Sequence, residues 1–296
     1  MRKKFNKIYI EITNKCNLNC SFCPKTTRPA EFMSLELFDR ITTQAQPLCE
    51  EITLHIMGEP LLHPQLKEFI LLCETKHIKI NITTNATLLE QNTDILLNKT
   101  VRRINLSIHG IKTNFNQENQ KKYLKKIINF TKIAQDKRED MIITYRLCNI
   151  NDGSNKSILK HIENEFDSTL QKNQGKNATT CKVIKTSKKI KNNAYIHFDM
   201  SFKWPDKKDP IRNTKGYCHG LATHIGVLCD GTIVPCCLDN NAQLALGNIN
   251  QNTIEEILQS KRAIAMKKGF QERKLVEDLC QRCTFIKQFE KEQDRK

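Results

Sequence analysis

The residues best suited to chemistry are three cysteines near the start of the chain. Cys16, Cys20 and Cys23 have the spacing C-x3-C-x2-C and follow a short apolar segment, Lys7–Thr13. Three thiolates on one tight loop can bind three irons of a 4Fe–4S cubane, whereas ferredoxin-type clusters use four cysteines. The fourth iron would keep an open position, at which a substrate or cofactor can bind directly.

A zinc site is the main alternative for this loop. Zinc loops typically combine C-x2–4-C with a second, distant pair of ligands. Over about the next forty residues the sequence adds only Cys49. The spacing therefore favours an iron–sulfur cluster over zinc, and also over a chance cluster of cysteines.

A second set of cysteines lies in the last third of the chain. Its members are Cys218, Cys229, Cys236, Cys237, Cys280 and Cys283. The segment from Cys218 to Cys236 reads C-x12-G-x4-C, in which Gly231 belongs to a predicted hairpin turn, and Cys280 and Cys283 form a closing C-x2-C pair. Four cysteines suit either a fully ligated 4Fe–4S cluster or a zinc ion, so both stay open here. Cys229 or Cys237 could replace Cys236, or lie buried as a small apolar residue.

The elements that must position these cysteines alternate between strand and helix. The predicted strands are Lys7–Thr13, Glu51–Ile56, Ile78–Ile82, Arg102–Ile108, Met141–Leu147 and Ala194–Phe198. The predicted helices are Leu35–Gln46, with Ser34 as its N-cap, Pro64–Lys76, Leu88–Leu97 and Phe115–Gln135. This alternation indicates βα units and a parallel sheet. We therefore expect an α/β fold, a partial (β/α)6 TIM-like barrel over residues 1–210, with a small C-terminal α+β domain over residues 211–296.

Polar residues fall at the C-terminal ends of several predicted strands. They are Gly58, Glu59, Thr84, Asn85, Ser107 and Arg146. Parallel barrels place their active sites at these strand ends, so the pattern indicates one shared site. Taken singly, Thr84-Asn85 could be only a turn, and Ser107 and Arg146 could be surface residues.

Together, these motifs resemble the radical S-adenosylmethionine (SAM) superfamily. The cysteine loop resembles the signature loop of that family, in which the aromatic residue at the position of Phe22 lies beside the adenine. The segment 57–60 (MGEP) resembles the GGE-type motif that contacts the SAM amino group, although Met57 replaces the first glycine. The resemblance implies a SAM site formed by Phe22, Gly58, Glu59, Thr84, Asn85, Ser107 and Arg146. Arg146 would suit the SAM carboxylate, because a guanidinium matches carboxylate geometry.

The second cysteine set resembles the auxiliary-cluster domains called SPASM and twitch. Gly247-Asn248-Ile249 and a predicted helix, Thr253–Ser260, resemble the middle of such domains. A full SPASM domain has further cysteines after the closing pair, and none follows Cys283. The resemblance therefore implies one twitch-like auxiliary 4Fe–4S cluster, with iron favoured over zinc. Its ligands would be Cys218, Cys236, Cys280 and Cys283. Ligation by four cysteines would favour electron transfer over substrate binding.

The resemblance implies an enzyme that reductively cleaves SAM to a 5′-deoxyadenosyl radical and abstracts hydrogen from its substrate. The substrate would be a peptide, a sugar or a cofactor precursor, and the class an oxidoreductase or a peptide-modifying enzyme. A flavodoxin or ferredoxin would be the reductant. No motif in the sequence selects among these substrates.

The composition limits the remaining possibilities. Thirteen cysteines in 296 residues are too few for a disulfide scaffold and favour metal or redox chemistry in the cytoplasm. We predict structural roles for Cys49, Cys73, Cys148 and Cys181. The sequence shows neither a signal-peptide pattern nor an apolar run of about 18 residues, so we expect no membrane association. A net charge of +16 leaves an RNA-modifying radical enzyme as an alternative, although the lysines are scattered. A non-catalytic metal-binding module is the third possibility.

Overall fold

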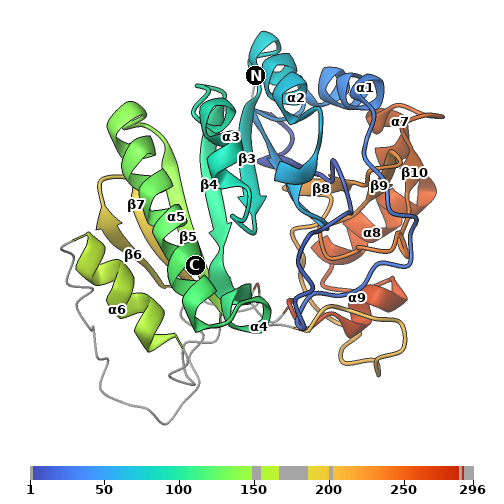
Figure 1. Cartoon of the computed structure of the whole chain (residues 1–296). Helices are drawn as coiled ribbons and strands as arrows, with labels where there is room; N and C mark the ends of the chain where they lie inside the picture. Colours follow the sequence, from blue (N-terminus) through green and yellow to red (C-terminus); the bar gives the residue numbers. More distant parts are fainter. Residues whose placement is uncertain (1–2, 149–154, 167–185, 200–202, 287–288, 290–296) are drawn as a thin grey trace. The chain divides into compact units, whose positions relative to one another are not determined.

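The computed structural model describes residues 3–148, 155–166, 186–199, 203–286 and 289 (Figure 1). The chain divides into two compact units. The first unit joins Met1–Ile82 with Phe202–Lys296, and the second unit is Thr83–Ser201. The domain boundary predicted near residue 210 remains a prediction.

The first unit contains a mixed sheet. Its strands are β1 (Lys7–Ile10), β2 (Glu51–Leu54), most of β3 (Lys79–Thr84), β8 (His224–Val227), β9 (Thr232–Val234) and β10 (Gly247–Asn248). Its helices are α1 (Leu35–Ala45), the 3-10 helix η1 (Pro60–Leu62), α2 (Leu66–Thr75), α7 (Ile254–Leu258), α8 (Lys261–Gln271) and α9 (Asp278–Arg282). The strands follow the order β10-β9-β8-β1-β2-β3, in which β8, β1, β2 and β3 are parallel and β9 and β10 are antiparallel to their neighbours.

The pairing of β8 with β1 is not predicted from the sequence. The two strands run parallel, in register from Lys7 opposite His224 to Ile10 opposite Val227. Both strands turn apolar residues into the core, and Ile8, Ile10 and Val227 are fully buried. The last third of the chain therefore completes the same sheet that carries the N-terminal cysteine loop.

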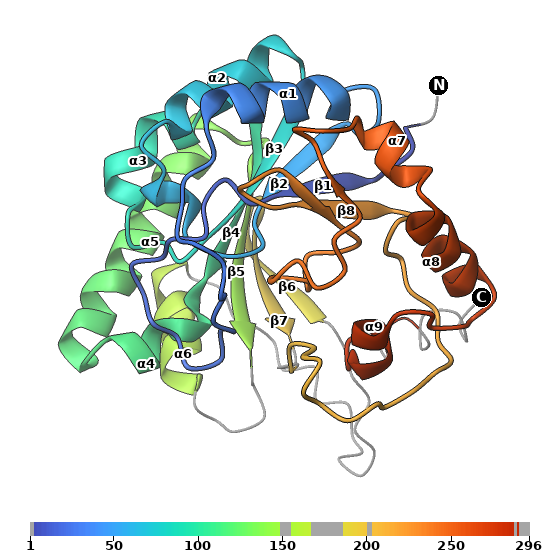
Figure 2. The ribbon, with the colours of Figure 1, turned by 90° about the vertical axis from the view of Figure 1, so that its right-hand side faces the viewer.

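Helices α1 and α2 lie side by side over the parallel strands of the first unit (Figure 2). Ser34 caps α1 as predicted, since its hydroxyl accepts a hydrogen bond from the Leu37 N–H at 3.1 Å. The buried face of α1 includes Phe38, whose ring stacks on Phe69 of α2 with centroids 4.1 Å apart. This packing fixes the helix that follows the cysteine loop.

The second unit contains a smaller sheet. Its strands are β4 (Val101–Ser107), β5 (Ile142–Cys148), β6 (Thr186–Lys191) and β7 (Ala194–Asp199). Its helices are α3 (Leu89–Leu96), the 3-10 helix η2 (Ile108–Gly110), α4 (Ile111–Asn114), α5 (Gln117–Lys137) and α6 (Lys156–Glu165). Strands β4, β5 and β7 are parallel, and β6 is antiparallel to β7 at the edge. Helix α5 packs on the sheet, where Thr131 and the buried Tyr145 hydroxyl lie 2.6 Å apart.

The strands and helices predicted over the first 150 residues, and the strand near residue 194, are confirmed within three residues at each end. Strand β1 stops at Ile10 because Thr13 turns away to bond the Glu31 carbonyl and to form a bridge with Phe32. The sequence does not predict β6, because its lysines hide the alternation of apolar and polar residues that is typical of a strand. Among the described residues, no helix has the length and apolar character needed to cross a membrane.

Candidate functional site

The N-terminal cysteines lie on the loop between β1 and α1. The loop closes on itself, because the Cys23 N–H bonds the Cys20 carbonyl at 3.2 Å and the Leu18 N–H bonds Cys16 Sγ at 3.5 Å. Burial and, to a smaller extent, the neighbouring Cys20 and Cys16 raise the pKa of Cys23 to about 11. The sulfur atoms of Cys16, Cys20 and Cys23 therefore lie near one another. Phe22, on the same loop, is 47% exposed.

Gly58 lies directly against the backbone that leads into this loop. Its φ of +74° is in the left-handed region, and a β-carbon there would be 2.3 Å from the Thr13 carbonyl oxygen and 2.8 Å from that of Lys15. The next residue, Glu59, donates its N–H to the Lys15 carbonyl at 2.8 Å. Only glycine permits so close an approach, so Gly58 and Glu59 are held beside Cys16.

The side chains around Gly58 also have structural roles that the motif does not indicate. Glu59 is 1% exposed, and its Oε1 accepts the Leu61 N–H at 3.0 Å, which caps η1. Met57, which replaces the first glycine of the motif, belongs to a small buried cluster with Ile56, Leu228 and Val234. Cys23 and Cys237 both pack against that cluster.

The Thr84-Asn85 pair lies at the end of β3, within the second unit. Thr84 Oγ1 accepts the Ala86 N–H at 2.9 Å, and Asn85 Oδ1 accepts the Thr87 N–H at 3.0 Å. The Tyr123 hydroxyl donates to the Asn85 carbonyl at 2.6 Å. The pair therefore forms a turn, as one of the alternatives above expects, and α5 holds that turn in place.

Ser107 and Arg146 are register partners at the ends of β4 and β5. Both side chains are partly exposed, and His109 Nδ1 lies 3.3 Å from the Arg146 carbonyl oxygen. Ser107 and Arg146 thus lie towards the C-terminal ends of neighbouring parallel strands. Their roles toward SAM remain predictions.

The first unit brings together the four cysteines predicted as auxiliary ligands. Loss of hydration raises the pKa of Cys236 well above its usual value, and Cys237, Cys218, Cys280 and Cys283 raise it further. Burial raises the pKa of Cys218 to about 12. A thiol ligand must lose its proton to bind a metal, so binding of a cofactor by these four cysteines would release protons.

Cys229 lies away from that set, in a buried polar cluster that the sequence analysis missed. Its Sγ is 3.4 Å from a guanidinium nitrogen of Arg28 and 3.3 Å from Glu31 Oε1. Arg28 also donates to both carboxylate oxygens of Glu11, at 2.6 and 2.8 Å, and its Nε donates to the Asn240 carbonyl at 2.9 Å. Arg28 therefore ties the N-terminal cysteine loop to the segment that follows Cys236 and Cys237.

The two cysteine sets differ in their number of thiols. Among the described residues, no three His, Cys, Asp or Glu side chains are arranged to hold one metal ion. Three neighbouring thiols in one set and four in the other match the ligand numbers expected for an open and a closed 4Fe–4S cluster.

Two of the cysteines predicted to be structural are buried. Cys49 and Cys73 are 1% and 0% exposed, and burial raises the pKa of each thiol to about 12. The side chain of Cys148 and the whole of Cys181 lie outside the described residues. None of the cysteines described with their side chains forms a disulfide.

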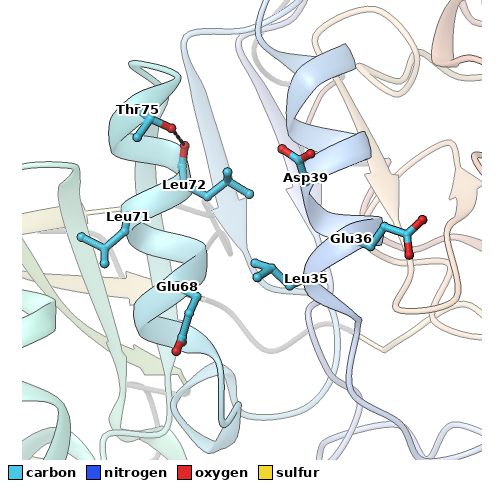
Figure 3. A pocket seen from close by; sticks show the side chains of 7 residues that line it. All are labelled: Leu35, Glu36, Asp39, Glu68, Leu71, Leu72 and Thr75. Carbon is cyan, nitrogen blue, oxygen red and sulfur yellow. Dashed lines mark hydrogen bonds between the residues drawn. The ribbon is translucent and has the colours of Figure 1, made fainter.

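A groove of about 650 Å³ lies between α1 and α2 (Figure 3). Its lining residues are Leu35, Glu36, Asp39, Glu68, Leu71, Leu72 and Thr75. Three of these lining residues are carboxylates, of which Asp39 pairs with Lys76 and Glu36 with Arg40, and none is a predicted site residue. We therefore do not assign it to the SAM site.

Two family profiles match the chain. That of the Radical SAM superfamily covers residues 10–193. That of the SPASM domain, an iron–sulfur cluster-binding domain, covers residues 218–284. The first includes the N-terminal cysteine loop, and the second includes all four predicted auxiliary ligands.

Curated relatives match parts of the chain. An uncharacterized protein of Methanocaldococcus jannaschii is 28% identical over 171 residues, which is 54% of either chain. GTP 3′,8-cyclase of Chlorobaculum tepidum is 31% identical over 107 residues, 34% of this chain and 32% of the cyclase. The chain thus matches about half of one relative's length and a third of the other's.

Solved structures match nearly the whole chain. BtrN in complex with AdoMet and 2-DOIA has a TM-score of 0.61 and 18% identity, over 96% of this chain and 94% of BtrN. Streptococcus suis SuiB bound to its precursor peptide SuiA has a TM-score of 0.62 and 15% identity, over 97% of this chain and 73% of SuiB. The predicted fold class is confirmed by this likeness: a mixed α/β fold with a parallel sheet of partial-barrel type and a C-terminal region.

Proposed function

The chain belongs to the radical SAM superfamily, and from that premise we propose that it abstracts hydrogen from a peptide, sugar or cofactor precursor after reductive cleavage of SAM. It is a radical SAM enzyme with a 4Fe–4S cluster, SAM and a SPASM auxiliary iron–sulfur cluster as its cofactors. When bound, the first cluster and SAM supply the radical that removes the hydrogen, and the auxiliary cluster supplies electron transfer.

The two sets of cysteines would hold two clusters with different roles. Cys16, Cys20 and Cys23 would hold the SAM-binding cluster and leave one iron open to SAM. Cys218, Cys236, Cys280 and Cys283 would hold one auxiliary 4Fe–4S cluster with no open iron. The observation that carries the proposal is that each set is brought together within the first unit, one on the β1–α1 loop and the other in the segment 218–283.

The remaining predicted residues would bind SAM. Gly58 lets the segment 57–60 lie against the cysteine loop, and Glu59, whose N–H bonds the Lys15 carbonyl there, would receive the SAM amino group. Arg146 would pair with the SAM carboxylate, while Thr84, Asn85 and Ser107 would offer polar contacts at strand ends. Phe22, with almost half of its surface exposed, offers a stacking face for adenine.

The solved structures that resemble this chain bind two kinds of ligand besides AdoMet. SuiB was crystallised with a precursor peptide, and anSMEcpe with a Cp18Cys peptide, but their identities to this chain are 15% and 13%. BtrN, at 18%, was crystallised with 2-DOIA. We favour an oxidation or a peptide modification, with a flavodoxin or ferredoxin as reductant.

A comparison of two cysteine variants tests the division of work without knowledge of the substrate. A Cys280→Ala/Cys283→Ala variant, given dithionite and SAM, should still release 5′-deoxyadenosine slowly, because SAM needs only the open iron. A Cys20→Ala variant should release none. Far-UV circular dichroism must show that both are folded, since metal binding and folding are coupled. If folded Cys280→Ala/Cys283→Ala is as inactive as Cys20→Ala, the proposed independence is wrong.

A further inference from the structure

A second groove, of about 470 Å³, lies beside α8 in the first unit. Figure 2 shows α7 and α8, in orange and red, next to each other in this part of the chain. The lining residues come from the N-terminal segment, the segment before β8, and α7 and α8. They are Lys4, Leu221, Leu258, Gln259, Ala263, Ile264, Lys267, Lys268 and Gln271.

The groove combines positive charge with exposed apolar surface. Three lysines and no carboxylate line it, and Ile264 is 49% exposed. The pKa of Lys4 is lowered, first by partial burial and then by the charge of Lys267. Two carboxylates also act on these lysines: Glu255 raises the pKa of Lys4, and Glu272 forms an ion pair with Lys268 at 3.7 Å. An anionic partner would reduce the repulsion between Lys4 and Lys267.

The same unit provides a contrast to this groove. The groove between α1 and α2 is lined by three carboxylates and no lysine or arginine (Figure 3). The chain carries a net charge of +16, so a basic surface alone is not distinctive. The α8 groove differs from a dispersed lysine surface because three lysines and the exposed side chain of Ile264 line one groove, where a partner of opposite charge would be attracted and oriented.

The groove also lies close to the auxiliary cysteines. Leu221, which lines it, directly follows Gly220, whose N–H lies 3.4 Å from Cys218 Sγ. A β-carbon placed on Gly220 would be 3.6 Å from Cys218 Sγ and 3.6 Å from the ring of Phe270. Phe270 is 3% exposed on the inner side of α8, whereas Ile264 is on the outer side. One helix therefore separates the groove from Cys218.

We propose that the α8 groove is the docking surface of an acidic electron-carrier protein, a partner with carboxylates around a one-electron centre. The inference rests on the proposed function, because an electron must reach the clusters before SAM is cleaved. In the complex one electron leaves the reduced carrier and enters the enzyme, and no bond or proton changes. The lysines steer and orient the carrier, Ile264 supplies apolar contact, and the proximity of Cys218 shortens the path of the electron.

The test measures binding of a purified flavodoxin to the anaerobically reconstituted enzyme by biolayer interferometry. A Lys267→Glu/Lys268→Glu variant should bind at least about tenfold more weakly at low ionic strength, and the wild-type affinity should fall as salt is added. The matched control is Lys121→Glu/Lys125→Glu on α5, which makes the same change in net charge at exposed positions of the second unit. This control should bind within about twofold of wild type. An Ile264→Ser variant should also weaken binding, without any change in charge.

The outcomes separate this inference from the proposed function. Equal weakening in both charge variants would overturn it, because attraction would then depend on net charge alone. It would also be overturned if the wild type, with both clusters formed and SAM cleaved by dithionite, did not bind flavodoxin. A short RNA that binds the wild type more tightly than flavodoxin, and is lost in Lys267→Glu/Lys268→Glu, would assign the groove to nucleic acid instead. Failure of the clusters to form would contradict the proposed function itself.

Discussion

Replacement of Arg28 by methionine should destabilise the first unit strongly, because it leaves the Glu11 carboxylate buried without its cation. The side chains of Arg28 and Glu11 are 10% and 0% exposed, and Arg28 contacts both carboxylate oxygens. Removal of one partner from a buried ion pair costs about 3–5 kcal/mol. The bond from Arg28 to the Asn240 carbonyl is lost as well. The effect would be a large part of the roughly 5–15 kcal/mol that stabilises a typical domain.

The loss of stability in Arg28→Met can be measured through the fluorescence of Trp204, the only tryptophan in the sequence. It belongs to the first unit, so its fluorescence during anaerobic urea unfolding reports on the unit that contains Arg28. Arg40→Met is the matched control, because Arg40 pairs with Glu36 at a surface where the side chains are 40% and 84% exposed. That variant should differ from wild type by no more than about 0.5 kcal/mol.

A double variant provides the decisive comparison. Arg28→Met/Glu11→Leu leaves no buried charge, so it should be more stable than Arg28→Met alone, although one more residue has been changed. If Arg28→Met lowers the unfolding free energy no more than Arg40→Met does, the carboxylate is not dependent on Arg28. If the double variant is the less stable of the two, the burial argument is wrong.

Three further predictions follow from the site. Cys16→Ala should reduce the iron bound after reconstitution from about eight to about four per chain; an unchanged iron content by colorimetric assay would remove Cys16 from the ligand set. Glu59→Gln and Arg146→Ala should each weaken SAM binding in titration calorimetry at unchanged iron content, and wild-type affinity in both would contradict the proposed SAM site. Burial and the charges of Lys7 and His219 lower the pKa of His224 to about 4 in the folded protein. As the pH falls, His224 is therefore protonated in the unfolded state before it is protonated in the folded state, and stability is lost. Between pH 7.5 and 5.5 the wild type should therefore lose about 1.4 kcal/mol more stability than His224→Gln, measured by Trp204 fluorescence, and parallel losses would exclude His224 as the cause.

Local patterns were sufficient to predict most of the fold. Alternating apolar residues predicted β2 and β4, and Ser34 predicted the start of α1, because these features depend on a few neighbouring residues. The pairing of β8 with β1 depends on residues that are far apart in the sequence. Nothing in either strand alone specifies that partner, so the sequence analysis, which assigned residues 211–296 to a C-terminal domain, made no prediction of this pairing.

The candidate site also has one part that could be predicted from local sequence and one part that could not. Spacing was enough to suggest Cys16, Cys20 and Cys23 as ligands, since a cluster loop is a local feature. The role of Arg28 was not predicted, because its partners Glu11 and Asn240 meet only in the folded chain. One signal was present in the sequence: Glu11, a charged residue, directly follows the apolar run of β1, where an unpaired charge would be costly.

During translation β1 is made long before its partner. Lys7 pairs with His224, so at about 5–20 residues per second the ribosome needs roughly 10–40 s to supply β8 after β1 has been synthesised. Over that time one edge of β1 lacks its partner, and Arg28 lacks the Asn240 carbonyl. An open strand edge invites pairing with other chains. Stable insertion of the first cluster is therefore expected after synthesis of residue 240, and a nascent chain stalled before that point should be prone to aggregate.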